Sequence, residues 1–109
     1  MTIKTERIRA LNDQLRTTGQ GGEVVVTHGV ATLTLETKVA IYAAVQAFDC
    51  FTTDNDPHGE HDFGLLDVAG HRVMFKIDYY DRSMSNLSPD PSDSKLTSRV
   101  LTIMLASEY

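Results

Sequence analysis

Carboxylate and imidazole side chains are concentrated in one short stretch of this chain. Residues 54–62 have the sequence DNDPHGEHD, which contains four acidic residues and two histidines. Their oxygen and nitrogen atoms are the donors that divalent metal ions accept in proteins. The stretch is therefore a candidate metal site, with the donor residues Asp54, Asp56, His58, Glu60, His61 and Asp62.

The spacing of these donors indicates which kind of metal site they would make. On the calcium loop of EF-hands, Asp54, Asp56 and Gly59 stand at positions one, three and six. His58 replaces the usual Asp or Asn at position five, and Leu65 stands where the bidentate Glu is needed. A mixed histidine and carboxylate site for zinc, manganese or iron fits the donors better, and an open coordination position there would activate water.

The same side chains have a structural alternative. Asp54 and Asp56 would form Asx-turns, Glu60 or Asp62 would pair with an arginine of the first helix, and His61 would donate to a carbonyl. Pro57 and Gly59 favour an ordered, turn-rich loop over residues 52–61. Such a loop needs no metal and can still serve as a recognition surface.

A second group of polar residues follows at 78–81, where two tyrosines stand between Asp78 and Asp81. Tyrosine is a common interface anchor, because it buries a large area and keeps a polar tip. We expect Tyr79 to face the core and Tyr80 to face outward. The predicted interaction surface comprises Asp54, Asp56, Glu60, Asp62, Asp78, Tyr80 and Asp81.

Other reaction classes find little support. The sequence has no Gly-x-Ser-x-Gly motif, and its glycine-rich segment at 19–22 leads into a strand, not a helix. The single cysteine, Cys50, lies among apolar residues, where we expect a buried thiol, and it excludes an internal disulfide. We assign no catalytic residue and no cofactor beyond the candidate divalent metal. The sequence favours a non-enzymatic protein over an enzyme.

The net charge of −5 is unevenly distributed along the 109 residues. Residues 1–48 hold five basic and four acidic side chains, and residues 49–109 hold five and eleven. An acidic surface repels phosphates, so direct binding of nucleic acid is disfavoured and a protein partner is favoured. No apolar run is long enough to span a bilayer, so we expect a cytoplasmic protein without a membrane segment.

The hydrophobic pattern predicts one α+β domain over residues 1–109, with the element order αβαββα and a short antiparallel sheet. A β-hairpin turning at Ala69-Gly70 would pack against the helices. The strand at 23–27 is uniformly β-branched, which is typical of a central or doubly buried strand. We expect a monomer or a homodimer, the latter through Met74 and Tyr80. The predicted helices are 3–18, 35–49 and 94–107, and the predicted strands are 23–27, 63–68 and 71–80.

Four segments together resemble a bacterial family catalogued as domain of unknown function 3768 (DUF3768). They are Leu11-Asn12-Asp13, residues 54–64 (DNDPHGEHDFG), residues 76–81 (KIDYYD) and residues 99–106 (RVLTIMLA). The resemblance implies an accessory product of plasmids and integrative elements in alphaproteobacteria, encoded near anti-restriction proteins. It implies no reaction and no catalytic residue.

Two hypotheses follow. The first is a non-enzymatic interaction protein of a mobile genetic element, an anti-CRISPR or anti-restriction inhibitor that binds a host protein, such as a defence nuclease complex, through its acidic surface. The second is a small metal-dependent hydrolase or nuclease that uses the donors of residues 54–62.

Overall fold

The fold is a four-stranded sheet covered mainly on one side by helices. The computed structural model describes residues 2–109. Strands lie in the order β1-β4-β3-β2, with β1 parallel to β4 and the other neighbours antiparallel. The predicted α+β class is confirmed. The elements are α1 (Ile3–Thr18), β1 (Glu23–Val26), α2 (His28–Ala31), α3 (Leu35–Ala47), β2 (Phe63–Val68), β3 (His71–Tyr80), β4 (Ser98–Leu105) and η1 (Ala106–Glu108).

Local capping signals set the ends of the two long helices as predicted. The Thr34 side chain accepts a hydrogen bond from the Thr37 backbone and begins α3. Gly19 ends α1 in the left-handed conformation with φ 77°, which glycine adopts without strain. The hairpin also turns at the predicted place, because Ala69 and Gly70 both have positive φ.

The predicted helix at 94–107 is wrong, because most of this segment is strand β4. Its apolar residues fit a helical stripe, yet they also alternate, and Leu101 and Ile103 are buried on the helix-covered face. Hydrogen bonding to β1 on one side and β3 on the other decides between the two patterns. The sheet is consequently mixed and not purely antiparallel.

Two further predictions about burial are wrong. β1 is an edge strand instead of a central one, and Val24 and Val25 are 45% and 38% exposed. β1 pairs with β4 on one side, and within residues 2–109 no strand pairs with it on the other. Cys50 is exposed because the chain has already left α3, which ends at Ala47, before it reaches this residue.

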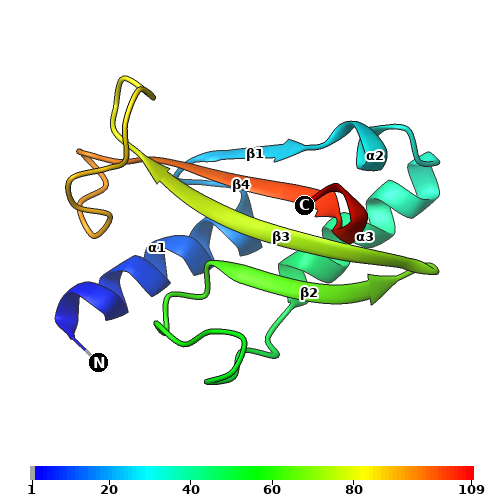
Figure 1. The fold of residues 1–109 in the computed structure, drawn as a ribbon, viewed down its shortest axis with the longest axis horizontal. Helices are drawn as coiled ribbons and strands as arrows, with labels where there is room; N and C mark the ends of the chain where they lie inside the picture. The colour runs from blue at the N-terminus through cyan, green and yellow to red at the C-terminus, as the bar shows by residue number, and fades with distance from the viewer. Residues whose placement is uncertain (1) are drawn as a thin grey trace.

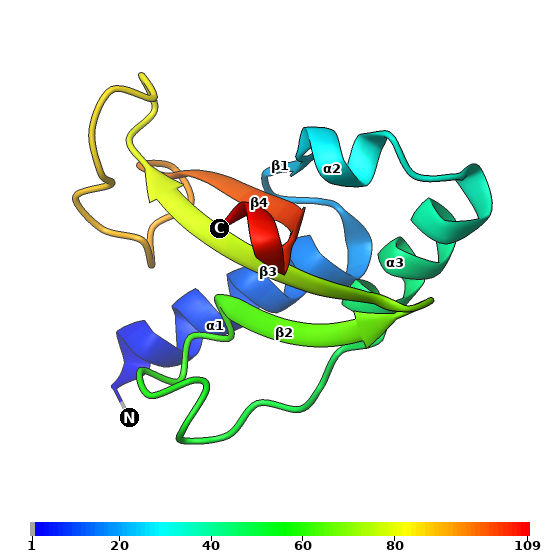
Figure 2. The same ribbon diagram turned by 45° about the vertical axis from the view of Figure 1, so that its right-hand side comes forward.

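α1 and α3 lie on one face of the sheet, and η1 lies against part of the other face (Figure 1). Leu15 and Ile41 from the helices pack with Phe75 and Leu101 from the strands to form the core. The turned view shows the same separation of the two faces (Figure 2). We call the side of the sheet that carries Lys76, Asp78 and Tyr80 of β3 the open face. The Met74 side chain points the same way but is only 4% exposed. It is therefore not accessible for the dimer contact that the sequence analysis predicted through Met74.

Candidate functional site

The 52–61 segment is an ordered loop stabilised by hydrogen bonds within itself. The buried Asp56 carboxylate accepts hydrogen bonds from the backbone N–H groups of Glu60 and His61, at 3.2 Å each. Asn55 accepts from the Thr52 N–H at 2.8 Å and donates to the Cys50 carbonyl at 2.8 Å. The predicted turn-rich loop is therefore confirmed, although Asn55 and Asp56, and not Asp54, provide the side-chain bonds that hold it.

α1 and the loop meet through charged and aromatic side chains. The His61 ring nitrogen Nδ1 lies 2.9 Å from Asp13 Oδ1, and the same oxygen accepts from Arg16 at 2.9 Å. The Phe51 ring stacks on the His61 imidazole with centroids 3.8 Å apart, and the Arg16 guanidinium lies over Phe51 at 5.1 Å. His61 adopts a positive φ of 55°, which is uncommon outside glycine, so these contacts hold a strained residue in place.

Asn12 connects the loop to the sheet. Its side-chain amide donates to the Glu60 carbonyl at 3.0 Å and to the Tyr79 hydroxyl at 2.8 Å. Its Oδ1 accepts from Arg99 Nε at 2.7 Å, and Asn12 is fully buried. The Tyr79 hydroxyl in turn donates to the Glu60 carboxylate at 2.7 Å. One asparagine thus joins three parts of the chain that are distant in sequence.

Arg99 is the most deeply buried charge of this region, with 2% exposure. Its guanidinium donates to Asn12 and to the Pro91 carbonyl and stacks on the Tyr79 ring at 5.1 Å. Within residues 2–109 no carboxylate lies at ion-pair distance from it. Burial lowers the pKa of Arg99, while Tyr79 and Glu60 act in the opposite direction. Buried arginine needs such contacts, because desolvation of an unpaired charge is costly.

Burial also shifts the acidity of two neighbours. Desolvation raises the pKa of the Tyr79 hydroxyl, and its hydrogen bond to Glu60 raises the pKa further. Burial and the nearby Glu60 charge raise the pKa of the Asp62 carboxyl. Both groups therefore hold their protons more tightly than they would in water. We call Asn12, Asp13, Asp56, Glu60, His61, Tyr79 and Arg99 the polar cluster.

The predicted site residues separate into two environments. Asp56, Glu60 and His61 belong to the polar cluster, where other side chains or backbone groups already occupy them. Asp54 and His58 are exposed, and Asp62 is intermediate. Asp78 and Tyr80 lie on the open face, where Asp78 pairs with Lys76 at 2.6 Å. Asp81, just after β3, accepts hydrogen bonds from Ser83 and Ser85.

The candidate metal donors do not converge. His61 Nε2 and Asp56 Oδ2 are 3.7 Å apart, and Asp56 already accepts hydrogen bonds from two backbone N–H groups. In the described part of the chain, no three His, Cys, Asp or Glu side chains are grouped so that they could hold a metal ion. The residues therefore do not form a preformed metal site, and we derive no reaction step through a metal.

The cluster also resembles part of a catalytic arrangement, because Asp13 orients the His61 imidazole. A nucleophile would have to reach the other ring nitrogen, and Asp56 stands there instead. Within residues 2–109, no hydroxyl or thiol is hydrogen-bonded to His61. The arrangement is suited to holding the loop in one conformation.

Sequence reasoning named the loop but missed its partners Asn12, Asp13 and Arg99 as functional or structural residues. One signal was available for Asn12. It follows Ile8 by four residues and precedes Leu15 by three, so it occupies a position of the buried stripe of α1. A polar residue there needs a buried partner, although the sequence does not say which one.

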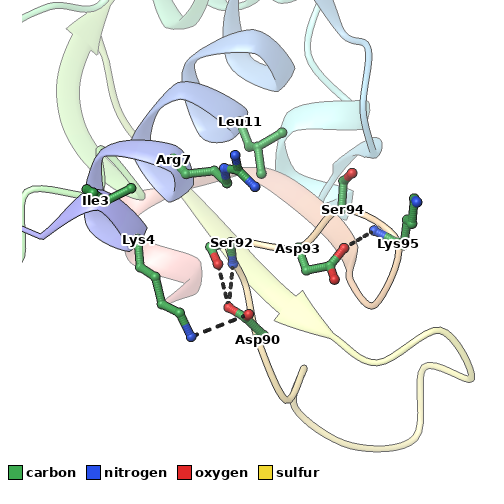
Figure 3. Close-up of a pocket in the computed structure, with 9 residues that line it drawn as sticks. All are labelled: Ile3, Lys4, Arg7, Leu11, Asp90, Ser92, Asp93, Ser94 and Lys95. Atoms are coloured by element: carbon green, nitrogen blue, oxygen red, sulfur yellow. Dashed lines mark hydrogen bonds and ion pairs between the residues drawn. The ribbon is translucent and has the colours of Figure 1, made fainter.

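A pocket of about 680 Å³ lies between the first half of α1 and the loop at 90–95 (Figure 3). Lys4 Nζ lies 3.5 Å from Asp90 across it, and Asp90 accepts two hydrogen bonds from Ser92. These hydrogen bonds, and the nearby Lys4, lower the pKa of Asp90. Pro91, on the same loop, receives the Arg99 bond, so the pocket wall is anchored to the polar cluster. No residue of the predicted site lines this pocket.

Comparisons with known proteins agree with the resemblance seen in the sequence. No helix within residues 2–109 is long and apolar enough to cross a membrane. Neither the curated proteins nor the solved structures include a match to this chain. A family model described as protein of unknown function (DUF3768) matches residues 26–108, which covers the loop, β2, β3 and β4 but not α1. The chain therefore belongs to the DUF3768 family.

Proposed function

We propose that this chain is a non-enzymatic interaction protein of a mobile genetic element that inhibits a host defence system. Its partner is a host protein, such as a CRISPR or restriction nuclease complex, and it binds through the acidic surface. The observation that carries the proposal is the open face. Within residues 2–109, η1 is the helix that lies against this side of the sheet (Figure 1). Asp78 and Tyr80 of β3 lie on this side and are partly buried.

The side chains on this surface are available for a partner. Within residues 2–109 the Tyr80 hydroxyl makes no hydrogen bond, and the ring is only partly buried. A tyrosine in this state supplies area and one polar group at low entropic cost. Asp54 is exposed on a loop that is already ordered, so binding through it does not require folding of the loop. These features favour recognition of a basic protein surface.

The loop contributes two kinds of acidic residue to this proposal. Asp56 and Glu60 support the fold, because their carboxylates bind groups inside the molecule. Asp54 and Asp62 supply negative charge to the surface.

The experiment is a plasmid cleavage assay with purified CRISPR and restriction nuclease complexes, in which this protein is added at increasing concentration. We expect inhibition of one complex, and we expect the Asp54→Asn/Asp62→Asn/Asp78→Asn variant to lose it. The matched control removes the same charge elsewhere, with Glu6→Gln/Glu23→Gln/Glu36→Gln, at exposed positions of the N-terminal half. Equal inhibition by both variants would refute the acidic surface, and no inhibition of any complex would refute the anti-defence role.

The alternative is a small metal-dependent hydrolase or nuclease that uses the histidine and carboxylate donors of residues 54–62, among which His61 Nε2 and Asp56 Oδ2 lie 3.7 Å apart. Elemental analysis of protein purified without chelators or metal-affinity resin tests it, together with the thermal midpoint before and after EDTA. Near-stoichiometric metal and a lower midpoint after chelation would favour this alternative. Protein without metal, and a midpoint unchanged by EDTA, would oppose it.

A further inference from the structure

Arg16 of α1 is a buried cation with few hydrogen-bond partners. The residue is 7% exposed, and its Nη1 donates to Asp13 Oδ1 at 2.9 Å. Within residues 2–109 the other two guanidinium nitrogens, Nε and Nη2, make no hydrogen bond, and Nε is enclosed. Proteins rarely leave a buried donor without a partner, because its desolvation is then uncompensated. The guanidinium therefore has binding capacity that the described chain does not use.

The two unbonded nitrogens share one edge of the guanidinium. In this planar group Nε–H and one N–H of Nη2 point the same way and form the fork that binds both oxygens of a carboxylate. Asp13 lies at Nη1, and its Oδ1 also contacts His61, so it leaves the fork open. The rings of Phe51 and Phe75 lie against the guanidinium, with centroids 5.1 and 6.0 Å from its carbon. These contacts fix the group without bonding to its fork.

Arg16 lines a groove of about 370 Å³, which we call the Arg16 groove. It lies between the end of α1, α3 and the strands β1 and β4. Most of its lining is leucine, valine and isoleucine, and Tyr42 and Gln46 of α3 add two uncharged polar groups. A mainly apolar wall with a few polar groups is typical of sites for small molecules. The volume is at the small end of the usual range for such sites.

The apolar part of the lining is suited to a hydrocarbon chain. Val45 and Leu101 belong to the core and form part of the lining. Val24 and Tyr42 also line the groove and are partly exposed to water. A hydrocarbon chain in the groove would cover the exposed parts of these two side chains, which favours binding.

Charge decides which end group the ligand carries. The protein has a net charge of −5, yet within residues 2–109 the lining of the Arg16 groove contains no carboxylate, and Arg16 is its one cation. A cationic ligand would meet the charge of Arg16. A neutral hydroxyl would bond to only one nitrogen of the fork, whereas a carboxylate offers one oxygen to each. The groove therefore favours an anion with two oxygens.

We propose that the Arg16 groove binds a small monocarboxylate with an unbranched hydrocarbon chain, such as a medium-chain fatty acid. The carboxylate bonds to Nε and Nη2 of Arg16, and the chain lies along Val45 and Leu101. Because Nε is enclosed, binding includes a small movement of the side chains around it. Asp54 and Asp78 of the acidic surface do not line this groove, so the inference is independent of the proposed anti-defence function.

Titration calorimetry tests the ligand class with three probes that share one hydrocarbon chain: sodium octanoate, octanol and octylammonium. We expect a dissociation constant below about 1 mM for octanoate, at least about tenfold lower than for the other two probes. In NMR spectra of the arginine Nε–H groups, the Arg16 signal should move as octanoate is added. No octanoate binding up to about 10 mM would overturn the proposal, as would equal binding of octanol or an unmoved Arg16 signal.

Two charge variants test the location. Gln46→Glu places a carboxylate in the wall of the Arg16 groove, and Asn86→Asp adds the same charge in an exposed loop that does not line it. We expect Gln46→Glu to weaken octanoate binding by about fivefold or more and to leave octanol binding unchanged. Asn86→Asp should change neither. Equal weakening of octanoate binding by both variants, or by neither, would rule out this groove.

Arg16→Met tests the fork itself. It should remove the preference for octanoate over octanol, and a preference that persists would overturn the role of Arg16. The variant also loses the bond to Asp13, so circular dichroism must first show that it is folded. If it is not folded, the result with Gln46→Glu decides, because Gln46 is exposed and its replacement leaves the core unchanged.

Discussion

Asn12 offers the most direct test of the polar cluster. Asn12→Ala removes two donated hydrogen bonds and one accepted bond at a fully buried position. The Tyr79 hydroxyl keeps its bond to Glu60, so its loss is small. Arg99 Nε and the Glu60 carbonyl lose their partners, and each unsatisfied buried group costs about 1–3 kcal/mol. We expect a loss of about 3–5 kcal/mol in the free energy of unfolding, out of a total of about 5–15 kcal/mol for a domain of this kind.

Urea unfolding followed by circular dichroism measures this loss. Asn55→Ala is the matched control, because Asn55 also uses both ends of its amide, yet it lies exposed in the loop. Its removal should cost no more than about 1 kcal/mol. A double-mutant cycle of Asn12→Ala with Arg99→Met should show coupling of about 1–2 kcal/mol, since the two side chains share a bond. If the two asparagine variants lose the same stability, the polar cluster does not stabilise the fold as argued.

Two further predictions concern pH and have opposite signs. The raised pKa of Asp62 means that the folded state loses stability as pH rises from the ordinary value of 3.8 through the raised value. Asp62→Asn should therefore increase the thermal midpoint at pH 7, with a gain that disappears toward pH 3.8, and a gain independent of pH would contradict this. The Glu108 carboxylate accepts hydrogen bonds from Thr27, Gly29 and Leu105. These bonds, chiefly the one from the Thr27 hydroxyl, lower the pKa of Glu108 below the ordinary value of 4.5. Glu108→Gln should lower the midpoint at pH 7, and the difference from wild type should close as pH falls below 4.5; a constant difference would refute the role of the charge.

The elements that sequence analysis predicted correctly are those whose signals are local. α1 and α3 carry their caps next to their apolar stripes, and the hairpin carries its turn residues between two alternating runs. β4 was missed because its identity depends on strands that are distant in sequence. Residues 98–105 satisfy both a helical stripe and an alternating pattern, and only pairing with β1 and β3 on its two sides selects the strand.

The candidate site was predictable only in part for the same reason. The acidic loop was visible as a concentration of charge, and its order followed from Pro57 and Gly59. The partners of the loop come from α1 and β4. Asn12 and Glu60 are 48 residues apart in the sequence, and Asn12 and Arg99 are 87 residues apart. With β4 assigned as a helix, no argument from the sequence could bring Arg99 beneath α1.

The polar cluster limits how the surface of this protein can be tested. Arg99 bonds to Pro91 on one side and to Asn12 on the other, and Asn12 continues to Glu60. The loop at 90–95 and the loop at 52–61 are therefore held by the same buried side chains. Removal of Glu60 or Asp56 would disturb both loops, so a loss of binding in such variants would report on the fold. Asp54 and Asp78 lie outside this network, which makes them the positions where lost binding identifies a contact with the partner.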